Sequence, residues 1–178
     1  MNNCFIVTPT FNDWKSLNKL LLSIDKNIKG LKRKIRILII NDCSTEKNDL
    51  NIKNLKNINS IKILNLKKNV GNQKSIYIGL KYLKKYAIDS TIVVMDSDGE
   101  DDPLELKKLI KLSIKNKNII FVASRKKRQE SLFLKFLNSI RLFITYILTG
   151  KYINFGNFSA YSSKHLKKIF STNDMWFA

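Results

Sequence analysis

The sequence predicts an α/β fold in which a mostly parallel sheet is flanked by helices, and three observations support this prediction. Five short runs rich in Ile and Val recur along the chain, and most are almost continuously apolar, as strands buried on both faces are. Segments with apolar residues at helical spacing lie between these runs, an alternation that favours a parallel sheet. The 178 residues are 44% hydrophobic, with six Gly and two Pro, which indicates a folded domain rather than a disordered chain.

The strands are expected, in chain order, at residues 4–9, 36–41, 61–66, 91–96 and 119–124. Apolar residues at helical spacing follow the first, third and fourth of these runs, beginning at Trp14, Ile76 and Leu104. Pro103 suits the first turn of the third helix, and Glu105 is favourable near its N-terminus. No internal repeat or linker interrupts this pattern, so the whole chain is expected to form one domain.

The chain carries a formal net charge of +19, which raises the question of a nucleic-acid partner. Only five of the 33 basic residues are Arg, and the abundance of Lys, Asn and Ile indicates a biased genome composition. The sequence shows no platform of alternating aromatic and basic residues. We therefore expect no nucleic-acid partner, and an anionic membrane surface fits the same charge better.

Polar residues follow each expected strand. They occupy residues 10–13, 42–45, 69–74, 96–98 and 124–125. Turn chemistry accounts for part of this pattern. In open α/β sheets, however, ligands bind beyond the carboxyl ends of the strands, and these ends carry both acids and bases. The sequence therefore predicts a ligand site at that edge of the sheet.

Five acids are concentrated after the fourth strand, within the stretch MDSDGEDDP at residues 95–103. If the strand conformation continues, Asp96 and Asp98 point to the same side and can share a hard cation such as Mg²⁺ or Mn²⁺. Glu100 continues this spacing. A solvated turn followed by a helix N-cap explains the stretch equally well when it is taken alone. The sequence has no EF-hand loop here, no phosphate-binding P-loop and no dinucleotide fingerprint.

Four segments taken together are more specific: VTPTFND, LIINDCST, LKKNVGNQKSIYIGL and MDSDGEDDP. Their order and spacing resemble the inverting family 2 glycosyltransferases, which have a GT-A (Rossmann-like) fold. The chain resembles most the branch that uses polyprenyl phosphate, the dolichol-phosphate mannosyltransferase-like enzymes. The later stretch from FVASR to GNFS is also similar to that branch, and the resemblance covers residues 4–170.

This resemblance implies transfer of a sugar, with inversion, from a UDP- or GDP-linked donor to a polyprenyl phosphate at the membrane surface. Two alternatives remain open: a nucleotidyltransferase, and a non-catalytic nucleotide-sugar-binding module derived from a glycosyltransferase. The resemblance also implies a peripheral position at the cytoplasmic face of the cell membrane. An oligomeric state is left open.

The resemblance further implies a role for each matching residue. The nucleotide sugar is expected to contact Pro9, Phe11, Asp13, Asp42, Asn69, Gly71 and Lys74. The expected ligands of Mg²⁺ or Mn²⁺ are Asp96, Asp98 and Glu100. The acceptor phosphate is expected to contact Arg125, Arg128, Lys135 and Ser139. The expected catalytic residues are Asp98, Asp101, which would lie near the transferred sugar, and Arg125.

Residues 132–149 form an expected amphipathic helix after the fifth strand, with its polar residues on one face. Such a helix either packs on the sheet or lies in the headgroup region of a membrane. We favour the second, because a lipid-phosphate acceptor must be met at the membrane surface. Residues 1–178 are expected to form a single catalytic domain that lacks the C-terminal part usual in this branch.

Overall fold

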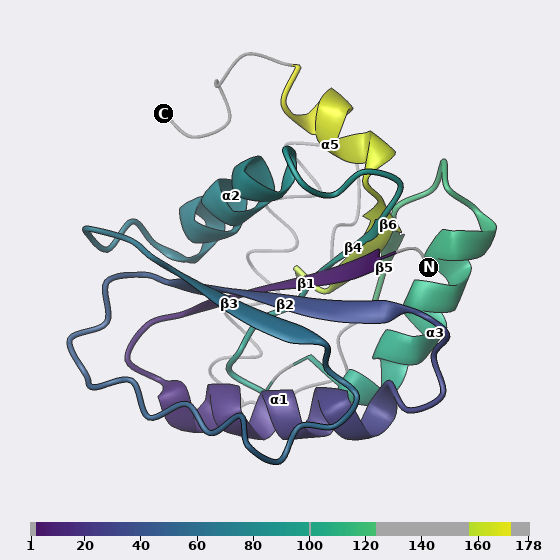
Figure 1. Cartoon of the computed structure of the whole chain (residues 1–178). Coiled ribbons are helices and arrows are strands. Elements are labelled where there is room, and N and C mark those ends of the chain that lie inside the picture. The colour runs from purple at the N-terminus through teal and green to yellow at the C-terminus, as the bar shows by residue number, and fades with distance from the viewer. Residues whose placement is uncertain (1–2, 100, 124–156, 172–178) are drawn as a thin grey trace, which may run out of the picture.

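Six strands form a single mixed sheet in the computed structural model, which describes residues 3–99, 101–123 and 157–171 (Figure 1). The strands are β1 (Asn3–Thr10), β2 (Lys34–Asn41), β3 (Ser60–Asn65), β4 (Thr91–Val94), β5 (Phe121–Val122) and β6 (Ser159–Ser162). Their order across the sheet is β3-β2-β1-β4-β6-β5. The first four strands run parallel, whereas β6 runs antiparallel to both β4 and β5. The predicted α/β fold class is confirmed.

The five predicted strands all form, although β5 is only two residues long. The sixth strand, β6, was not predicted, because its sequence SAYS is short and half of it is serine. In the structure Ala160 and Tyr161 are buried on opposite sides of the sheet, one in each of the two apolar layers. Tertiary pairing with β4 therefore creates a strand that the local pattern does not show.

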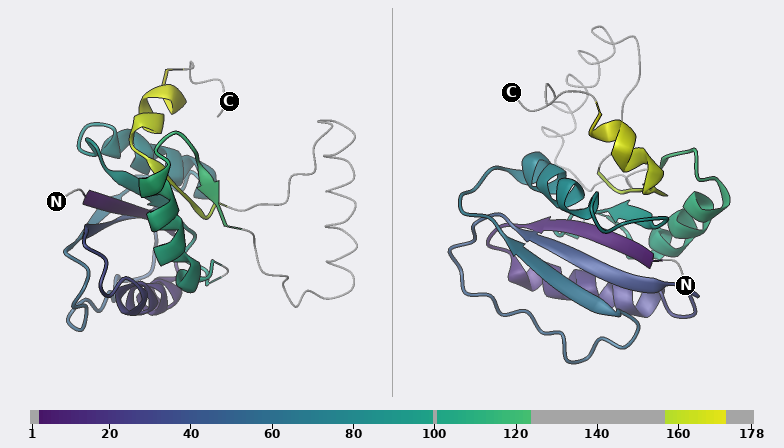
Figure 2. Two further views of the ribbon diagram at one scale, coloured as in Figure 1. Left: turned by 90° about the vertical axis from the view of Figure 1, so that its right-hand side faces the viewer. Right: turned by 45° about the horizontal axis from the view of Figure 1, so that its top comes forward.

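Helices cover both faces of the sheet (Figures 1 and 2). One face is covered by α1 (Trp14–Asn27) and α3 (Pro103–Lys115), and the other by α2 (Asn72–Leu83) and α5 (Lys164–Ile169). The three predicted helices are thus confirmed. The predicted amphipathic helix at residues 132–149 lies outside the described residues. None of the helices within the described ranges has the length and apolar character needed to cross a bilayer.

The core is divided by the sheet into two apolar layers, because side chains alternate along each strand. In β1, Cys4 and Ile6 face α1 and α3, whereas Phe5 and Val7 face α2. Gly79 lets α2 approach the sheet closely, since a Cβ there would lie 2.7 Å from Cδ1 of Ile40. This close approach holds the N-terminus of α2 at the carboxyl edge of the sheet.

The connection between β2 and β3 contains no helix. It is held in place by two polar side chains, Asn12 just before α1 and Asp25 within α1. The Asn12 carboxamide oxygen accepts hydrogen bonds from the backbone N–H of Thr45 and of Glu46, at 2.8 and 3.1 Å. Further along, one carboxylate oxygen of the buried Asp25 accepts three backbone N–H groups at 2.7–3.0 Å, from residues 56–58. Burial alone would raise the pKa of Asp25, but these hydrogen bonds outweigh it, so the pKa lies below its usual value.

Candidate functional site

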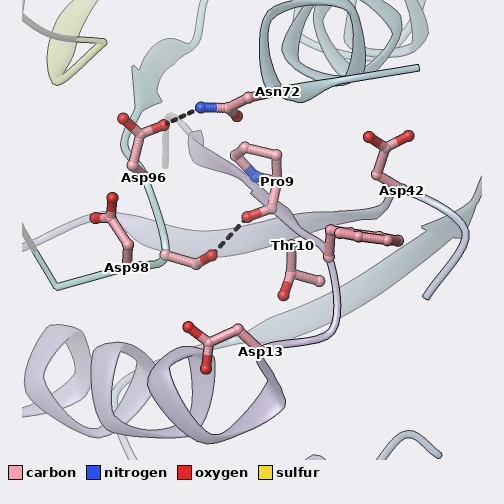
Figure 3. A pocket seen from close by; sticks show the side chains of 9 residues that line it. Pro9, Thr10, Asp13, Asp42, Asn72, Asp96 and Asp98 are labelled. Carbon is pink, nitrogen blue, oxygen red and sulfur yellow. Dashed lines mark hydrogen bonds between the residues drawn. The ribbon is translucent and has the colours of Figure 1, made fainter. Parts of the chain in front are cut away.

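A cavity of about 190 Å³ opens at the carboxyl edge of the sheet (Figure 3). The residues that line it come from the ends of β1, β2 and β4 and from the start of α2: Pro9, Thr10, Phe11, Asp13, Asp42, Asn72, Asp96, Ser97 and Asp98. Six of these nine residues were predicted from the sequence to contact a donor or a metal ion. Four carboxylates thus share one cavity in a strongly basic chain.

Asp42 lies at the end of β2 and is held by backbone groups. Its two carboxylate oxygens accept the N–H of Val70 and the N–H of Gly71, both at 2.8 Å. Gly71 has a φ of +85°, a conformation that favours glycine, and it is the N-cap of α2. Asn69 also accepts the Gly71 N–H, at 3.1 Å, so Asn69 and Gly71 form the turn that Asp42 anchors. Neither residue lines the cavity in the described part of the chain.

Asp96 lies at the end of β4 and is held by side-chain amides instead. Asn72 donates a hydrogen bond to its Oδ1 at 3.1 Å, and Asn157 donates to Oδ1 and Oδ2 at 3.0 and 3.1 Å. Asn157 in turn accepts a hydrogen bond from Gln73 at 2.9 Å. We call Asn72, Gln73 and Asn157 the amide cluster. It joins the start of α2 to the segment just before β6. It orients a carboxylate that is only 4% exposed.

Asp98 is exposed at the mouth of the cavity, two residues after Asp96. Figure 3 shows the carboxylates of Asp96 and Asp98 on one side of the cavity and that of Asp42 on the other. The intervening Ser97 turns away, and its hydroxyl donates to the carbonyl of Pro9 at 2.7 Å. This bond ties the end of β4 to the end of β1, so both aspartates face the ligand space.

The arrangement of Asp96 and Asp98 suits a hard cation, because carboxylate oxygens are the ligands that Mg²⁺ and Mn²⁺ prefer. Within the described residues, no group of three acids, cysteines or histidines is close enough to hold a metal ion. The predicted third ligand, Glu100, lies outside those residues. The metal-ligand roles of Asp96, Asp98 and Glu100 therefore stay predictions.

Asp101 and Asp102 have other partners. Asp101 is 3% exposed, and its Oδ2 accepts the backbone N–H of Asp96 at 2.8 Å, which closes the loop after β4. Asp102 caps α3 by accepting the N–H of Leu104 at 3.0 Å. Asp101 does not line the cavity in the described part of the chain, and its predicted place near the transferred sugar stays a prediction.

The remaining predicted residues divide into three groups. Phe11 lies at the rim with 48% of its surface exposed, and Asp13 both lines the cavity and caps α1 through a 3.0 Å hydrogen bond from the Ser16 N–H. Lys74 is exposed in the first turn of α2 and does not line the cavity in the described part of the chain. The predicted acceptor residues are outside the described residues: Arg125, Arg128, Lys135 and Ser139.

Four residues of this site were not predicted from the sequence: Thr10, Asn72, Ser97 and Asn157. Thr10 lines the cavity and is 3% exposed, and within the described residues its hydroxyl has no hydrogen-bond partner. Figure 3 shows its side chain directed to the same side as Asp13. Asn72 and Asn157 stood in segments that carry the family resemblance, NVGNQK and GNFS, but amide side chains in such segments give no local signal of their partner.

The comparisons with known proteins decide the family. The family model "Glycosyl transferase family 2" matches residues 5–171. The chain belongs to glycosyl transferase family 2. The resemblance drawn from the sequence motifs is therefore confirmed.

Curated relatives of this family 2 member act on lipid phosphates, as their names state. The chain is 24% identical over 137 residues to an undecaprenyl-phosphate 4-deoxy-4-formamido-L-arabinose transferase of Proteus mirabilis, covering 76% of this chain and 40% of that protein. It is 28% identical over 120 residues to a dolichol-phosphate mannosyltransferase of Pyrococcus furiosus, covering 67% of this chain and 32% of that protein. The matched region is thus less than half the length of these relatives.

Solved structures show the same fold. TarS 1-349 of S. aureus in complex with UDP-GlcNAc has a TM-score of 0.58 at 21% identity, covering 94% of this chain and 47% of that chain. The mannosyltransferase PcManGT of Pyrobaculum calidifontis, in complex with GDP-Man and Mn²⁺, has a TM-score of 0.56 at 14% identity, covering 94% and 46%. These structural neighbours are GT-A glycosyltransferases, so the predicted GT-A fold is confirmed.

Proposed function

We propose that the cavity binds a nucleoside-diphosphate sugar and that the enzyme transfers the sugar, with inversion, to a polyprenyl phosphate. The observation that carries this proposal is the convergence of Asp42, Asp96 and Asp98 from two strand ends on one cavity, with Asp96 oriented by the amide cluster. A cavity of about 190 Å³ holds part of such a donor rather than all of it. The names of the curated relatives support the lipid-phosphate acceptor.

The donor is divided between the two sides of the cavity. Phe11 offers its exposed ring to the base, and Asp42 lies on the side where base or ribose N–H and O–H groups would be accepted. Thr10 adds a buried hydroxyl that a polar atom of the donor can satisfy. Asn69, Gly71 and Lys74 lie at the turn into α2, within reach of the sugar or phosphates in this proposal.

The opposite side of the cavity carries the carboxylates proposed to bind the metal ion. Asp96, Asp98 and Glu100 would hold Mg²⁺ or Mn²⁺, which when bound offsets the charge of the diphosphate leaving group. An Mn²⁺ ion in the complex of the structural neighbour from Pyrobaculum calidifontis supports this metal class. Asp96 is kept in one orientation by Asn72 and Asn157, so its contribution is fixed before the donor arrives.

The acceptor phosphate is already an oxyanion at neutral pH, so its attack on the anomeric carbon needs little help from a general base. What it needs is positive charge that positions it. We propose Arg125 for this role, because a guanidinium binds phosphate through two parallel hydrogen bonds, with Arg128, Lys135 and Ser139 as further contacts. Asp101 is proposed to lie near the transferred sugar. The amphipathic helix predicted at residues 132–149 would bring the acceptor site to the cytoplasmic membrane surface.

A transfer assay tests this proposal. The chain is incubated with labelled UDP- or GDP-sugars, Mn²⁺ and polyprenyl phosphate, and we expect labelled lipid and free nucleoside diphosphate. Arg125→Ala should abolish transfer while donor binding survives. Release of pyrophosphate from a nucleoside triphosphate and a sugar phosphate would instead indicate a nucleotidyltransferase. Donor binding without transfer to any acceptor would favour a binding module.

A further inference from the structure

Two lysine-rich segments of the chain contain no acidic residue. Residues 60–88 contain seven Lys and residues 157–171 contain three, and neither segment contains an Asp or Glu. These segments contain β3 at one edge of the sheet, β6 within it, and α2 and α5, which cover one of its faces (Figure 2). The opposite side is mixed in charge, because α1 and α3 carry Asp25 and Glu105 besides their lysines. The net charge of +19 is therefore unevenly distributed.

Aromatic rings hold several of these lysines in place. Lys62 of β3 lies 4.9 Å from the ring centroid of Tyr82, and its ammonium donates a hydrogen bond to the Tyr82 hydroxyl. Lys81 lies 5.7 Å from the Tyr77 ring. Lys84 and Phe170 are joined in the same way, at 5.6 Å, and the Tyr77 and Phe170 rings are 5.2 Å apart. We call this surface the lysine–aromatic face: Lys62, Lys81, Lys84, Tyr77, Tyr82 and Phe170.

Exposed apolar side chains also occur in α5 and in the turn after α2. Ile88, in the turn after α2, is 83% exposed, Tyr86 is 57% exposed, and Ile169 of α5 is 37% exposed. The ring of Tyr86 lies 5.0 Å from that of Tyr82, so it belongs to the same surface. The neighbouring acid, Asp89, is paired with Lys117 at 2.9 Å, which offsets its charge. Apolar tips beside lysines are typical of surfaces that meet a bilayer, where the ammonium groups reach the phosphates.

We propose that the lysine–aromatic face binds anionic lipid headgroups. Each lysine near such a surface adds attraction, and the exposed Ile88 and Tyr86 would enter the boundary between headgroups and acyl chains. A nucleic acid fits the same positive charge less well. Residues 60–88 and 157–171 contain no Arg, the residue that binds phosphates and base edges through paired hydrogen bonds. A nucleic acid would also offer no apolar partner to the exposed Ile88 side chain. The preference for lipid also rests on the proposed lipid-phosphate acceptor.

Matched charge variants of the full chain test this inference. The triple variant Lys62→Gln, Lys81→Gln and Lys84→Gln removes three charges from the face. The control Lys15→Gln, Lys19→Gln and Lys26→Gln removes three from exposed positions of α1, with the same change in net charge. Binding to vesicles of phosphatidylcholine with about one third phosphatidylglycerol is measured by co-sedimentation. We expect the face variant to lose about tenfold or more in affinity, and the control less than about twofold. Equal losses in both variants would overturn the inference.

Two further measurements distinguish other outcomes. Tyr86→Ser with Ile88→Ser keeps every charge and should weaken binding about threefold, most visibly at high salt, where apolar insertion dominates. If the face variant loses binding to single-stranded RNA while its vesicle binding is unchanged, the face is a nucleic-acid site and the inference is wrong. Donor-induced thermal stabilisation should be the same in the face variant and the wild type. If no donor stabilises the wild type, the proposed function is contradicted, whereas the inference about lipid binding is not.

Discussion

The acidic cavity and the lysine–aromatic face hold their charges in opposite ways. In the cavity, Asp42 and Asp96 are 3% and 4% exposed, and each accepts directed N–H groups, from backbone in one case and amide side chains in the other. On the face, ammonium groups lie over aromatic rings at the exposed surface. Fixed, buried carboxylates suit a ligand recognised by geometry. Exposed lysines suit an extended surface recognised by charge.

The largest expected effect on donor affinity comes from removing the exposed carboxylate of the cavity, Asp98. Asp98→Ala should weaken binding of the cognate nucleotide sugar in the presence of Mn²⁺ by about 100-fold, because a charged contact in a partly enclosed site is lost. Isothermal titration measures this change. Asp102→Ala is the matched control from the same acidic stretch, since Asp102 caps α3 and does not line the cavity. Similar affinity losses in both variants would contradict the assignment of Asp98.

Asp25 is a buried, hydrogen-bonded carboxylate that does not line the cavity, so its removal tests structural stabilisation apart from ligand binding. It lies in α1 and accepts three backbone N–H groups of the β2–β3 connection. Asp25→Ala should lower the free energy of unfolding by about 2 kcal/mol at pH 7 and leave donor affinity unchanged. Because the folded-state pKa is lowered, this stabilisation is present above about pH 4 and is lost as pH falls through the folded pKa. Chemical denaturation at pH 7 and pH 3 measures this change, and a difference in stability that is as large at pH 3 as at pH 7 would contradict this role of Asp25.

Asn157 provides a further test, because its side-chain amide donates to Asp96, whereas backbone N–H groups donate to Asp42. Asn157→Asp would set a second carboxylate against both oxygens of Asp96, which now accept hydrogen bonds from the amide. We expect about tenfold weaker donor binding at pH 8, with recovery as pH falls, since like charges raise the pKa of one member of the pair. Asn54→Asp, in an exposed loop, is the control. A pH profile identical to that of the wild type would show that Asn157 does not orient Asp96.

Salt gives the most general contrast between the two regions. Raising NaCl from about 50 to about 500 mM shortens the screening length and should reduce vesicle binding by the lysine–aromatic face by more than tenfold. Donor affinity should change by no more than about threefold, because buried and fixed contacts are screened less. Both affinities are measured on the same protein preparation. Equal salt dependence would mean that the cavity also binds mainly through exposed charge.

Much of this architecture could be predicted because it depends on local patterns. Ile and Val runs predict the parallel strands, and polar residues after those runs predict the edge where Asp42, Asp96 and Asp98 meet. Asn157 could not be predicted in this role, because it is 61 residues from Asp96 and only the pairing of β6 with β4 brings them together. Nothing in the local sequence SAYS indicates that pairing.

The lysine–aromatic face illustrates the same limit on a surface. Its residues come from β3, α2 and the end of α5, so no single segment shows alternating aromatic and basic residues. No such platform is therefore visible in the sequence. Lys62 and Tyr82 meet because β3 is the edge strand beside α2, a consequence of strand order rather than of spacing. The absence of acids from residues 60–88 was the signal that sequence alone could have offered.

The most direct test of the central claim is a thermal-shift measurement on the full chain with UDP- and GDP-sugars, with and without Mn²⁺. The account predicts that one donor raises the melting temperature by several degrees in the presence of Mn²⁺, as binding to the folded state must. It also predicts that Asp98→Ala abolishes this response while Asp102→Ala keeps it. If no nucleotide sugar stabilises the protein, or if Asp98→Ala responds like the wild type, the cavity is not the donor site.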